Sequence, residues 1–488
     1  MAETMTLGAP ARAAGAHGHP VRATVVTGAA QFMAALDNLV VTMALPVIRR
    51  HLHTGFAGLE WTVNAYTLSF AVLLLGGAAL GDRFGRRRMF IAGLALFTGA
   101  SAVSALAPNI SVLIAARALQ GAGGALIVPL SLTLLSASVP AARRNLALGI
   151  WGALSGLAVA IGPLVGGAVV EGLSWQFIFW LNVPIGLALI PAARFGLGES
   201  HGAPRRLDLR GIALASAGLF GIVLGLVRGG TVGWGSSEVL ASFVGGVVLL
   251  GTFVALERRL AEPMLQLELF SKRSFSVINV VAMLMSFGMF GAIFLLAQYL
   301  QTVQHYSPLD AGIRTLPWTG MPVIVAPIAG LLVERVGARV LVGMGLALQA
   351  VGLAWFAAIL QPGTPYGEVV PAFVVSGIGM ALFFVPVASL VLGSVRPDQE
   401  GIASGTNNAL RELGGVFGVS VLGAIFTATG SYASGTAFVA GLIPAVAVGS
   451  GVVFVGALLT LLLPGQRRAG TAARAAERPA VGVMAVAR

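Results

Sequence analysis

The chain has 488 residues, of which 57% are hydrophobic and 10% are charged, and its mean hydropathy is +0.90. A water-soluble protein cannot bury that much apolar surface, so the composition excludes a soluble fold. The net charge is +12, but the arginines are scattered through short segments without an aromatic platform, so we expect no nucleic-acid partner.

Apolar runs of about 20 residues follow one another along the chain, and each is long enough to cross a hydrocarbon core about 30 Å thick. Lipid offers backbone amides no hydrogen-bond partner, so each run must form a helix. The sequence therefore predicts an all-α membrane protein with about fourteen spans. They cover residues 24–45, 61–81, 88–107, 110–135, 145–169, 174–195, 210–228, 238–256, 275–299, 311–332, 340–360, 369–393, 401–426 and 438–463.

The basic residues predict the orientation. With the N-terminus inside, 24 of the 30 Lys and Arg residues fall on the cytoplasmic side, and Arg49, Arg50, Arg228 and Arg314 fall on the outer side. By the positive-inside rule, both termini are cytoplasmic and the number of spans is even. Residues 1–23 and 464–488 are then cytoplasmic tails. Because residues 1–22 contain no apolar core, we expect no cleavable signal peptide.

Two charged segments between spans repeat each other, residues 78–87 and residues 330–339. Each has an acid, Asp82 or Glu334, followed directly by Arg and three positions later by Gly, and the offset is 334 − 82 = 252 residues. Duplicated bundles are typical of secondary transporters. We therefore expect two six-helix bundles, 24–197 and 274–463, related by a pseudo-two-fold axis along the membrane normal. The inserted pair, 208–257, has no charged residue well inside it and is expected to be peripheral.

Few ionisable residues lie within the spans, and Asp37, Arg117, Arg411 and Glu412 are the deep ones. Each costs at least about 2.5–3.5 kcal/mol at membrane depth, so each needs a partner, a wet cavity or a function. By contrast, Glu60 flanks a span end and is expected to be in water, as are Glu238 and Asp310.

Asp37 is the first candidate for proton coupling, because a carboxyl in a partly dry cavity can change its charge as water access alternates. The alternative is a permanently salt-bridged structural carboxylate. Glu412 is the second candidate, although it could simply pair with Arg411 on a wet cavity wall. Asn408 and Arg411 lie on one polar stripe of their helix. With Asp37 and Asn38 they form the expected substrate cavity.

Several segments resemble a known family. Residues 78–87, with Asp82, Arg83, Gly85 and Arg86, resemble the signature loop of the major facilitator superfamily, although Ala78 replaces its first glycine. Residues 113–121 are similar to its fourth-helix motif, whose arginine, here Arg117, is assigned a role in proton coupling. This resemblance implies a cytoplasmic gate formed by Asp82, Arg83, Gly85, Arg86, Glu334 and Arg335. It also implies that Asp82 approaches residues 400–405 in the outward-facing state.

The fifth span resembles the motif associated with antiporters rather than symporters. It contains Gly149, Gly162, Pro163, Gly166 and Gly167, with Ala158 in place of one expected glycine. Small residues allow close helix approach and proline bends a helix. These residues are therefore interpreted either as a hinge for alternating access or as tight packing alone.

Three further segments resemble fourteen-helix drug:proton antiporters: residues 36–46, residues 175–186, where Gln176 replaces the usual Arg, and residues 401–415. The resemblance covers roughly residues 24–465 and implies the major facilitator fold in the cytoplasmic membrane.

The resulting expectation is a monomeric, proton-coupled antiporter in membrane lipid that exports small amphipathic organic compounds. A proton-coupled uptake symporter is the alternative. A polytopic membrane enzyme would need a nucleophile or metal constellation, and we expect none, nor any cofactor. The motif G-x-x-x-x-G-K-[ST] for binding ATP phosphates is absent. Substrate charge stays open, because Asp37 and Glu412 suit cations whereas Arg117 and Arg411 suit anions or neutral polar groups.

Overall fold

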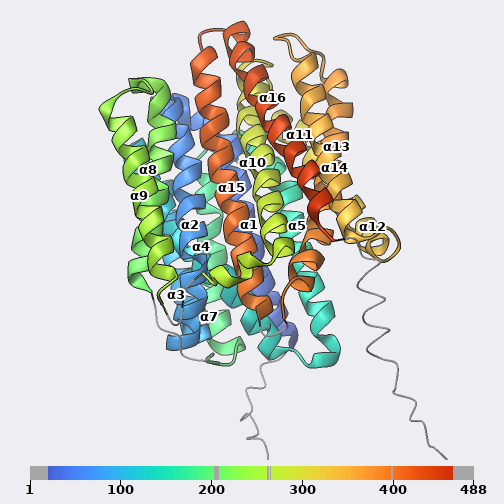
Figure 1. Ribbon diagram of the computed structural model, residues 1–488. Coiled ribbons are helices and arrows are strands. Elements are labelled where there is room, and N and C mark those ends of the chain that lie inside the picture. Colours follow the sequence, from blue (N-terminus) through green and yellow to red (C-terminus); the bar gives the residue numbers. More distant parts are fainter. Residues whose placement is uncertain (1–19, 203–207, 261–262, 264, 397–398, 465–488) are drawn as a thin grey trace, which may run out of the picture.

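The computed structural model describes residues 20–202, 208–260, 263, 265–396 and 399–464, and within these ranges it contains helices and no strand (Figure 1). The predicted tails, 1–23 and 464–488, lie almost entirely outside the described residues. The helices in chain order are α1 (Pro20–His51), α2 (Phe56–Phe84), α3 (Arg86–Ala105), α4 (Ile110–Ser138), α5 (Ala141–Gly172), α6 (Phe177–Trp180), α7 (Asn182–Gly196), α8 (Leu209–Val232), α9 (Ser237–Glu257), η1 (Leu267–Ser271), α10 (Arg273–Thr302), α11 (Pro308–Thr319), α12 (Met321–Val336), α13 (Ala338–Ile359), α14 (Tyr366–Gly393), α15 (Glu400–Thr429), α16 (Gly435–Leu459) and η3 (Thr460–Leu462).

The number of membrane-spanning elements agrees with the sequence. In the described part of the chain, 13 helical segments are long and apolar enough to cross a membrane, with α11 and α12 counted together as Pro308–Val336. Helix α2 brings the number to 14; it is bent by 52° between Phe56–Leu74 and Gly76–Phe84. The prediction of an all-α membrane protein with about fourteen spans is confirmed.

The helices form two bundles and a pair. In the first bundle α1 packs on α5, α2 and α3 pack on α4, and α3 packs on α7. In the second, α10 packs on α15 and α16, and α13 packs on α14 and α16. Helices α8 and α9 pack on each other at one flank (Figure 1). Because α8 contacts both α2 and α15, the pair is peripheral in place but touches both bundles.

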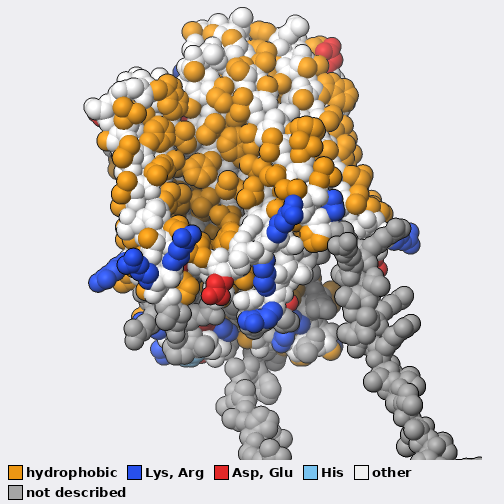
Figure 2. All heavy atoms as spheres, in the orientation of Figure 1, with side chains coloured by type: hydrophobic (Ala, Val, Ile, Leu, Met, Phe, Trp, Pro, Cys, Tyr) orange, Lys and Arg blue, Asp and Glu red, His pale blue; other side chains and the backbone are white. Residues whose placement is uncertain are grey.

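The two ends of the structure differ in charge. Figure 2 shows Lys and Arg side chains gathered at the lower end, beneath a broad band of hydrophobic side chains. At this basic end α1 begins and α2 ends (Figure 1). We call the opposite end, where α2 and α11 begin and α15 ends, the distal end. The wide hydrophobic band is the surface expected of a protein surrounded by lipid.

Among the described residues, four hydrogen bonds join the bundles; three lie on the distal halves of the helices involved, and the fourth lies nearer the middle of the span formed by α11 and α12. Their donors and acceptors are Asn64 Nδ2 to Ser420 Oγ (2.9 Å), Gln301 Nε2 to the Met43 carbonyl (2.9 Å), the Leu309 amide to Glu171 Oε2 (2.9 Å) and Thr319 Oγ1 to the Ala160 carbonyl (3.1 Å). The bundles are therefore sealed against each other at the distal end.

Toward the basic end, no hydrogen bond joins the described residues of the two bundles, although α2 and α15 still meet where Leu74 and Ala409 share a buried cluster. On this half of α5, a Cβ added at Gly149, Gly152 or Gly156 would meet no heavy atom within 4 Å. The bend in α2 falls on the same half of the molecule. Figure 2 shows a hollow lined by hydrophobic side chains between the α8–α9 pair and α15. The bundles are thus joined more closely at the distal end than toward the basic end, which is the arrangement of a conformation open at the basic end.

The two repeated loops share one backbone feature. Gly85 ends α2 with φ +102°, and Gly337 ends α12 with φ +97°. Residues with a side chain rarely adopt this conformation, which explains a glycine three positions after the acid in both copies.

Candidate functional site

The buried carboxylate of Asp37, near the middle of α1, accepts hydrogen bonds from three side chains. Asp37 is 2% exposed. Oδ2 forms an ion pair with Arg117 of α4, and Oδ1 accepts hydrogen bonds from Gln120 Nε2 (2.8 Å) and Asn182 Nδ2 (2.7 Å). Three donors from two helices thus converge on one acid, an arrangement suited to an ionised carboxylate.

Arg117 is fully buried and links three helices. Besides Asp37, its Nε donates to the Thr62 carbonyl of α2 (3.2 Å) and its Nη1 donates to Gln120 Oε1 (2.8 Å). Its guanidinium carbon lies 4.3 Å from the centre of the Tyr66 ring. Arg117 Nη2 has no hydrogen-bond partner among the described residues. A buried cation held this way is costly to leave alone, so Asp37 and Arg117 depend on each other.

Small residues on α4 allow α2 and α3 to approach it closely. A Cβ at Gly121 would lie 2.2 Å from the Tyr66 carbonyl oxygen, and one at Gly123 would lie 2.7 Å from the Phe97 amide nitrogen. Helices α2 and α3 therefore lie directly against α4. This contact brings Arg117 within reach of the α2 backbone, and it brings Gln120 Nε2 to 2.8 Å from Ser101 Oγ on α3.

Sequence reasoning paired neither Gln120 nor Asn182 with Asp37. Both residues lie within the family-like segments 113–121 and 175–186, but neutral amides carry no charge that marks them in an apolar helix. Asn182 opens α7 directly after the short helix α6, and this break aims its side chain at α1. The available signal was a buried amide in each of two helices predicted to belong to the same bundle.

The second candidate acid, Glu412, is 7% exposed and lies on α15. Its Oε1 is 3.6 Å from Arg411 Nη2, while its Oε2 has no hydrogen-bond partner among the described residues. Asn408, one turn away, and Asn38, beside Asp37, are both half-buried. The Tyr66 phenol lies within electrostatic reach of Asp37, Arg117 and Glu412, and it donates a hydrogen bond to the Ala34 carbonyl (3.2 Å).

Glu60 corrects a sequence-based expectation. Predicted to be in water at a span end, it is 2% exposed, because α2 begins at Phe56 and carries Glu60 one turn into the helix. There it faces α15, where a Cβ at Gly423 would lie 2.0 Å from Glu60 Oε1. Glu60 is therefore one of four buried acids in the described spans, with Asp37, Glu412 and Glu257 at the end of α9.

The glycine-rich part of α5 meets two helices. A Cβ at Gly162 would lie 2.8 Å from Leu39 Cβ, and one at Gly166 would lie 2.7 Å from the Val40 carbonyl oxygen, so both glycines pack on α1. On the other bundle, a Cβ at Gly167 would lie 2.2 Å from the Pro308 carbonyl oxygen, and the Pro163 carbonyl oxygen lies 2.4 Å from a Cβ at Gly312. These residues pack tightly. A hinge in α5 that bends during transport stays a prediction. Gly149 has no such contact.

The residues predicted to form a gate are divided between two loops. Asp82 pairs with Arg86 at 2.8 Å and its carbonyl accepts from the Gly202 amide, whereas Arg83 is exposed. Glu334 and Arg335, in the second copy, are both exposed. The structure shows the conformation open at the basic end, so the predicted approach of Asp82 to residues 400–405 stays a prediction.

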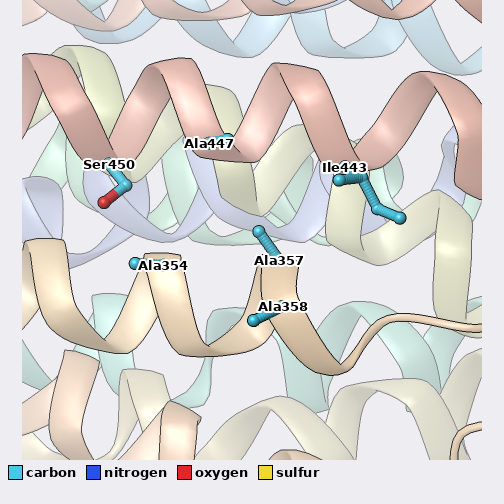
Figure 3. Close-up of a pocket in the computed structure, with 6 residues that line it drawn as sticks. All are labelled: Ala354, Ala357, Ala358, Ile443, Ala447 and Ser450. Atoms are coloured by element: carbon cyan, nitrogen blue, oxygen red, sulfur yellow. The ribbon is translucent and has the colours of Figure 1, made fainter.

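A separate shallow groove lies between α13 and α16 (Figure 3). Its volume is about 290 Å³, and the residues that line it are Ala354, Ala357, Ala358, Ile443, Ala447 and Ser450. This groove involves one bundle and no charged side chain. The polar site around Asp37 is elsewhere, on α1, α4 and α7.

Comparison with known proteins identifies the family. A family model described as Major Facilitator Superfamily matches residues 27–419 and 278–486. The chain is 34% identical over 415 residues to the tetracenomycin C resistance and export protein of Streptomyces glaucescens, covering 85% of this chain and 77% of that protein. It is 38% identical over 422 residues to the cephamycin export protein CmcT of Amycolatopsis lactamdurans, covering 85% and 86%. It is also 35% identical over 406 residues to the multidrug resistance protein Stp of Mycobacterium tuberculosis, covering 83% and 75%.

Solved structures support the same fold. A peptide transporter POT in complex with sulfate has a TM-score of 0.65 at 16% identity, over 92% of this chain and 97% of that chain. The xylose transporter XylE from E. coli has a TM-score of 0.60 at 14% identity, over 92% and 99%. This protein is therefore a multi-pass protein of the cytoplasmic membrane with two six-helix bundles and two additional helices. The chain belongs to the major facilitator superfamily of membrane transporters.

Proposed function

We propose that the protein is a proton-coupled antiporter that exports small amphipathic organic compounds, such as antibiotics or other toxic molecules, by alternating access. The observation that carries this proposal is the buried Asp37–Arg117 pair with its two amide donors. An acid at membrane depth that is held by hydrogen bonds can exchange its partner cation for a proton when water reaches it.

The geometry supports the following cycle. With the basic end placed in the cytoplasm by the positive-inside rule, the conformation described above faces inward. Substrate would enter from that side between the bundles, near Asn38, Asn408 and Arg411. Asp37, protonated from outside, would release its proton inward and pair with Arg117. Substrate and proton would then compete, because both depend on the charge state of the same site.

Names of the relatives support the direction of transport. Those relatives are named for resistance to, or export of, tetracenomycin C, cephamycin, methylenomycin A and puromycin, and one is a probable actinorhodin transporter. These compounds make a first panel for transport measurements. We propose no enzymatic activity and no cofactor for this chain.

The experiment is transport in inside-out membrane vesicles. An imposed pH gradient, acidic inside, should drive accumulation of a panel compound, and adding that compound should release protons from the vesicles. A protonophore should abolish both signals. Substrate leaving the vesicles together with protons would indicate an uptake symporter, and accumulation that ignores the protonophore would remove proton coupling from the proposal.

A further inference from the structure

Glu60 occupies a place that the proposed transport cycle must open and close. It lies on the distal half of α2, in what we call the distal seam: Phe56, Glu60 and Asn64 of α2 against Ser420, Gly423 and Phe426 of α15. Its carboxyl rests against the Cα of Gly423, and a Cβ there would lie 2.0 Å from Oε1. One turn deeper, Asn64 donates to Ser420 at 2.9 Å. The carboxyl is therefore enclosed between the two bundles.

The surroundings of Glu60 toward the distal end are aromatic. Phe56 stacks on Phe426 with ring centres 5.0 Å apart and meets Phe294 of α10 edge-on at 5.6 Å. Tyr432, in the segment after α15, packs against Phe426 at 6.0 Å. These rings separate Glu60 from the distal surface, which explains its 2% exposure.

No charged group compensates Glu60 among the described residues. Its Oε1 has no hydrogen-bond partner, and no ion pair to it is present. The titratable groups on the surrounding elements contact other residues. Arg117 of α4 is paired with Asp37, and Arg228 of α8 is paired with Glu238. Arg49 of α1 lies 3.6 Å from the centre of the Tyr432 ring, His51 of α1 packs against Trp175, and the Tyr432 phenol donates to Gln298 of α10. The distal halves of α10 and α15 carry no Asp, Glu, Lys, Arg or His.

An ionised carboxylate without a partner is among the costliest groups to bury, whereas a protonated carboxyl is neutral. In the closed seam, Glu60 is accommodated as the neutral acid. If α2 and α15 separate when the distal end opens, water reaches Glu60 and favours the ionised form. Charge on Glu60 and closure of the distal seam therefore oppose each other.

We propose that Glu60 is a proton-binding group that controls the distal seam, which closes on the protonated carboxyl and opens on the carboxylate. The proton comes from water on the distal side and returns there when the seam reopens, so Glu60 senses pH at that face, while Asp37 exchanges the proton that is transported. This inference rests on the proposed function, because it requires a transporter that alternates between two openings.

Spin-label distances can test the proposal without transport. The chain has no native cysteine, so single labels go to introduced ones. Gly172 at the end of α5 and Gly367 near the start of α14 are exposed glycines on opposite bundles at the distal end, and a Cβ at either meets nothing within 4 Å. Labels at Gly172→Cys and Gly367→Cys should show a short distance in acid and a growing long-distance population as pH rises.

In Glu60→Gln the short distance should persist at every pH, because the side chain stays neutral. Glu60→Met, neutral and of similar length, gives the same readout if the glutamine variant does not fold. Glu60→Asp should keep a pH response. Glu238→Gln, which changes an exposed distal acid, is the matched control and should behave like the parent. A pH response in Glu60→Gln or Glu60→Met that equals the parent's would overturn the proposal.

The two proposals fail separately. Proton-driven antiport together with an unchanged pH response of the labels in Glu60→Gln would remove the role of Glu60 and leave the proposed function intact. A pH response that disappears in Glu60→Gln, in a protein without proton-driven transport, would keep the seam proposal and remove proton coupling. In the labelled Asp37→Asn variant, we expect opening with rising pH to persist, because Glu60 is unchanged.

Discussion

Asp37 and Glu60 are equally buried, yet their surroundings differ in kind. Asp37 accepts from Arg117, Gln120 and Asn182, all within its own bundle. Glu60 has no such donor and faces a glycine on the other bundle. The comparison shows that hydrogen-bond donors and counter-ions, more than burial, decide whether a membrane protein accommodates the ionised or the protonated form of a carboxyl group. It also fits the two different roles that we propose for these acids, one inside a bundle and one between bundles.

The largest effect is expected at Asp37. Asp37→Asn should abolish proton-driven transport in inside-out vesicles, because the amide keeps the size of the side chain but cannot exchange a proton. Arg117 would be left without its anion, a loss worth about 3–5 kcal/mol for a buried pair. Asp37→Asn combined with Arg117→Gln should recover thermal stability without recovering transport. Undiminished proton-driven transport in Asp37→Asn would move the coupling site elsewhere.

Removing one donor should have the next largest effect. Asn182→Leu deletes a hydrogen bond to an ionised carboxylate, which is worth about 1.5–3 kcal/mol. Ser420→Ala is the comparison within the distal seam, since it removes a bond between neutral groups worth about 0.5–1.5 kcal/mol. Thermal unfolding in detergent should rank the variants in that order. Equal losses of thermal stability in Asn182→Leu and Ser420→Ala would show that the hydrogen bond from Asn182 to Asp37 is no stronger than the bond between Asn64 and Ser420.

Gly423→Ala tests how closely the seam fits around Glu60. The added methyl would lie 2.0 Å from Glu60 Oε1, and overpacking of this kind costs about 1–3 kcal/mol. The cost applies to the closed seam, so spin labels at positions 172 and 367 should report a larger open population. Gly251→Ala, on a face of α9 with no heavy atom within 4 Å, should leave that population unchanged. An equal response in the two variants would mean that the seam is loose.

The smallest effect is expected at the repeated loops. Asp82 is paired with Arg86 and partly buried, so Asp82→Asn should cost about 0.2–1 kcal/mol. Glu334→Gln, at an exposed position of the second copy, should leave thermal stability unchanged. If the predicted approach of Asp82 to residues 400–405 is correct, Asp82→Asn should also shift the labels toward the inward-facing distance. A larger stability loss at Glu334 would contradict the assignment of partners at this end.

Most of the fold was predictable because lipid leaves few alternatives. Apolar runs of sufficient length must be helices, and this rule predicted about fourteen spans correctly. The glycines of the repeated loops were predictable as well, since Gly85 and Gly337 adopt a conformation that side chains disfavour. Asp37 and Arg117 stood out as charges at membrane depth, and the structure brings them together.

Only the tertiary structure decided which groups meet. Gln120 and Asn182 are neutral, so no local sequence pattern indicates that they donate hydrogen bonds to Asp37 from two other helices. Glu60 was wrongly predicted to lie in water, because the sequence defines the end of a span only to within one helical turn. One turn is also the distance between an exposed helix end and the buried distal seam. The sequence by itself determined a membrane bundle with a few buried charges, because hydrophobic length and charge are local properties. Partner choice depends on contacts between helices distant in the chain, and only packing produces those.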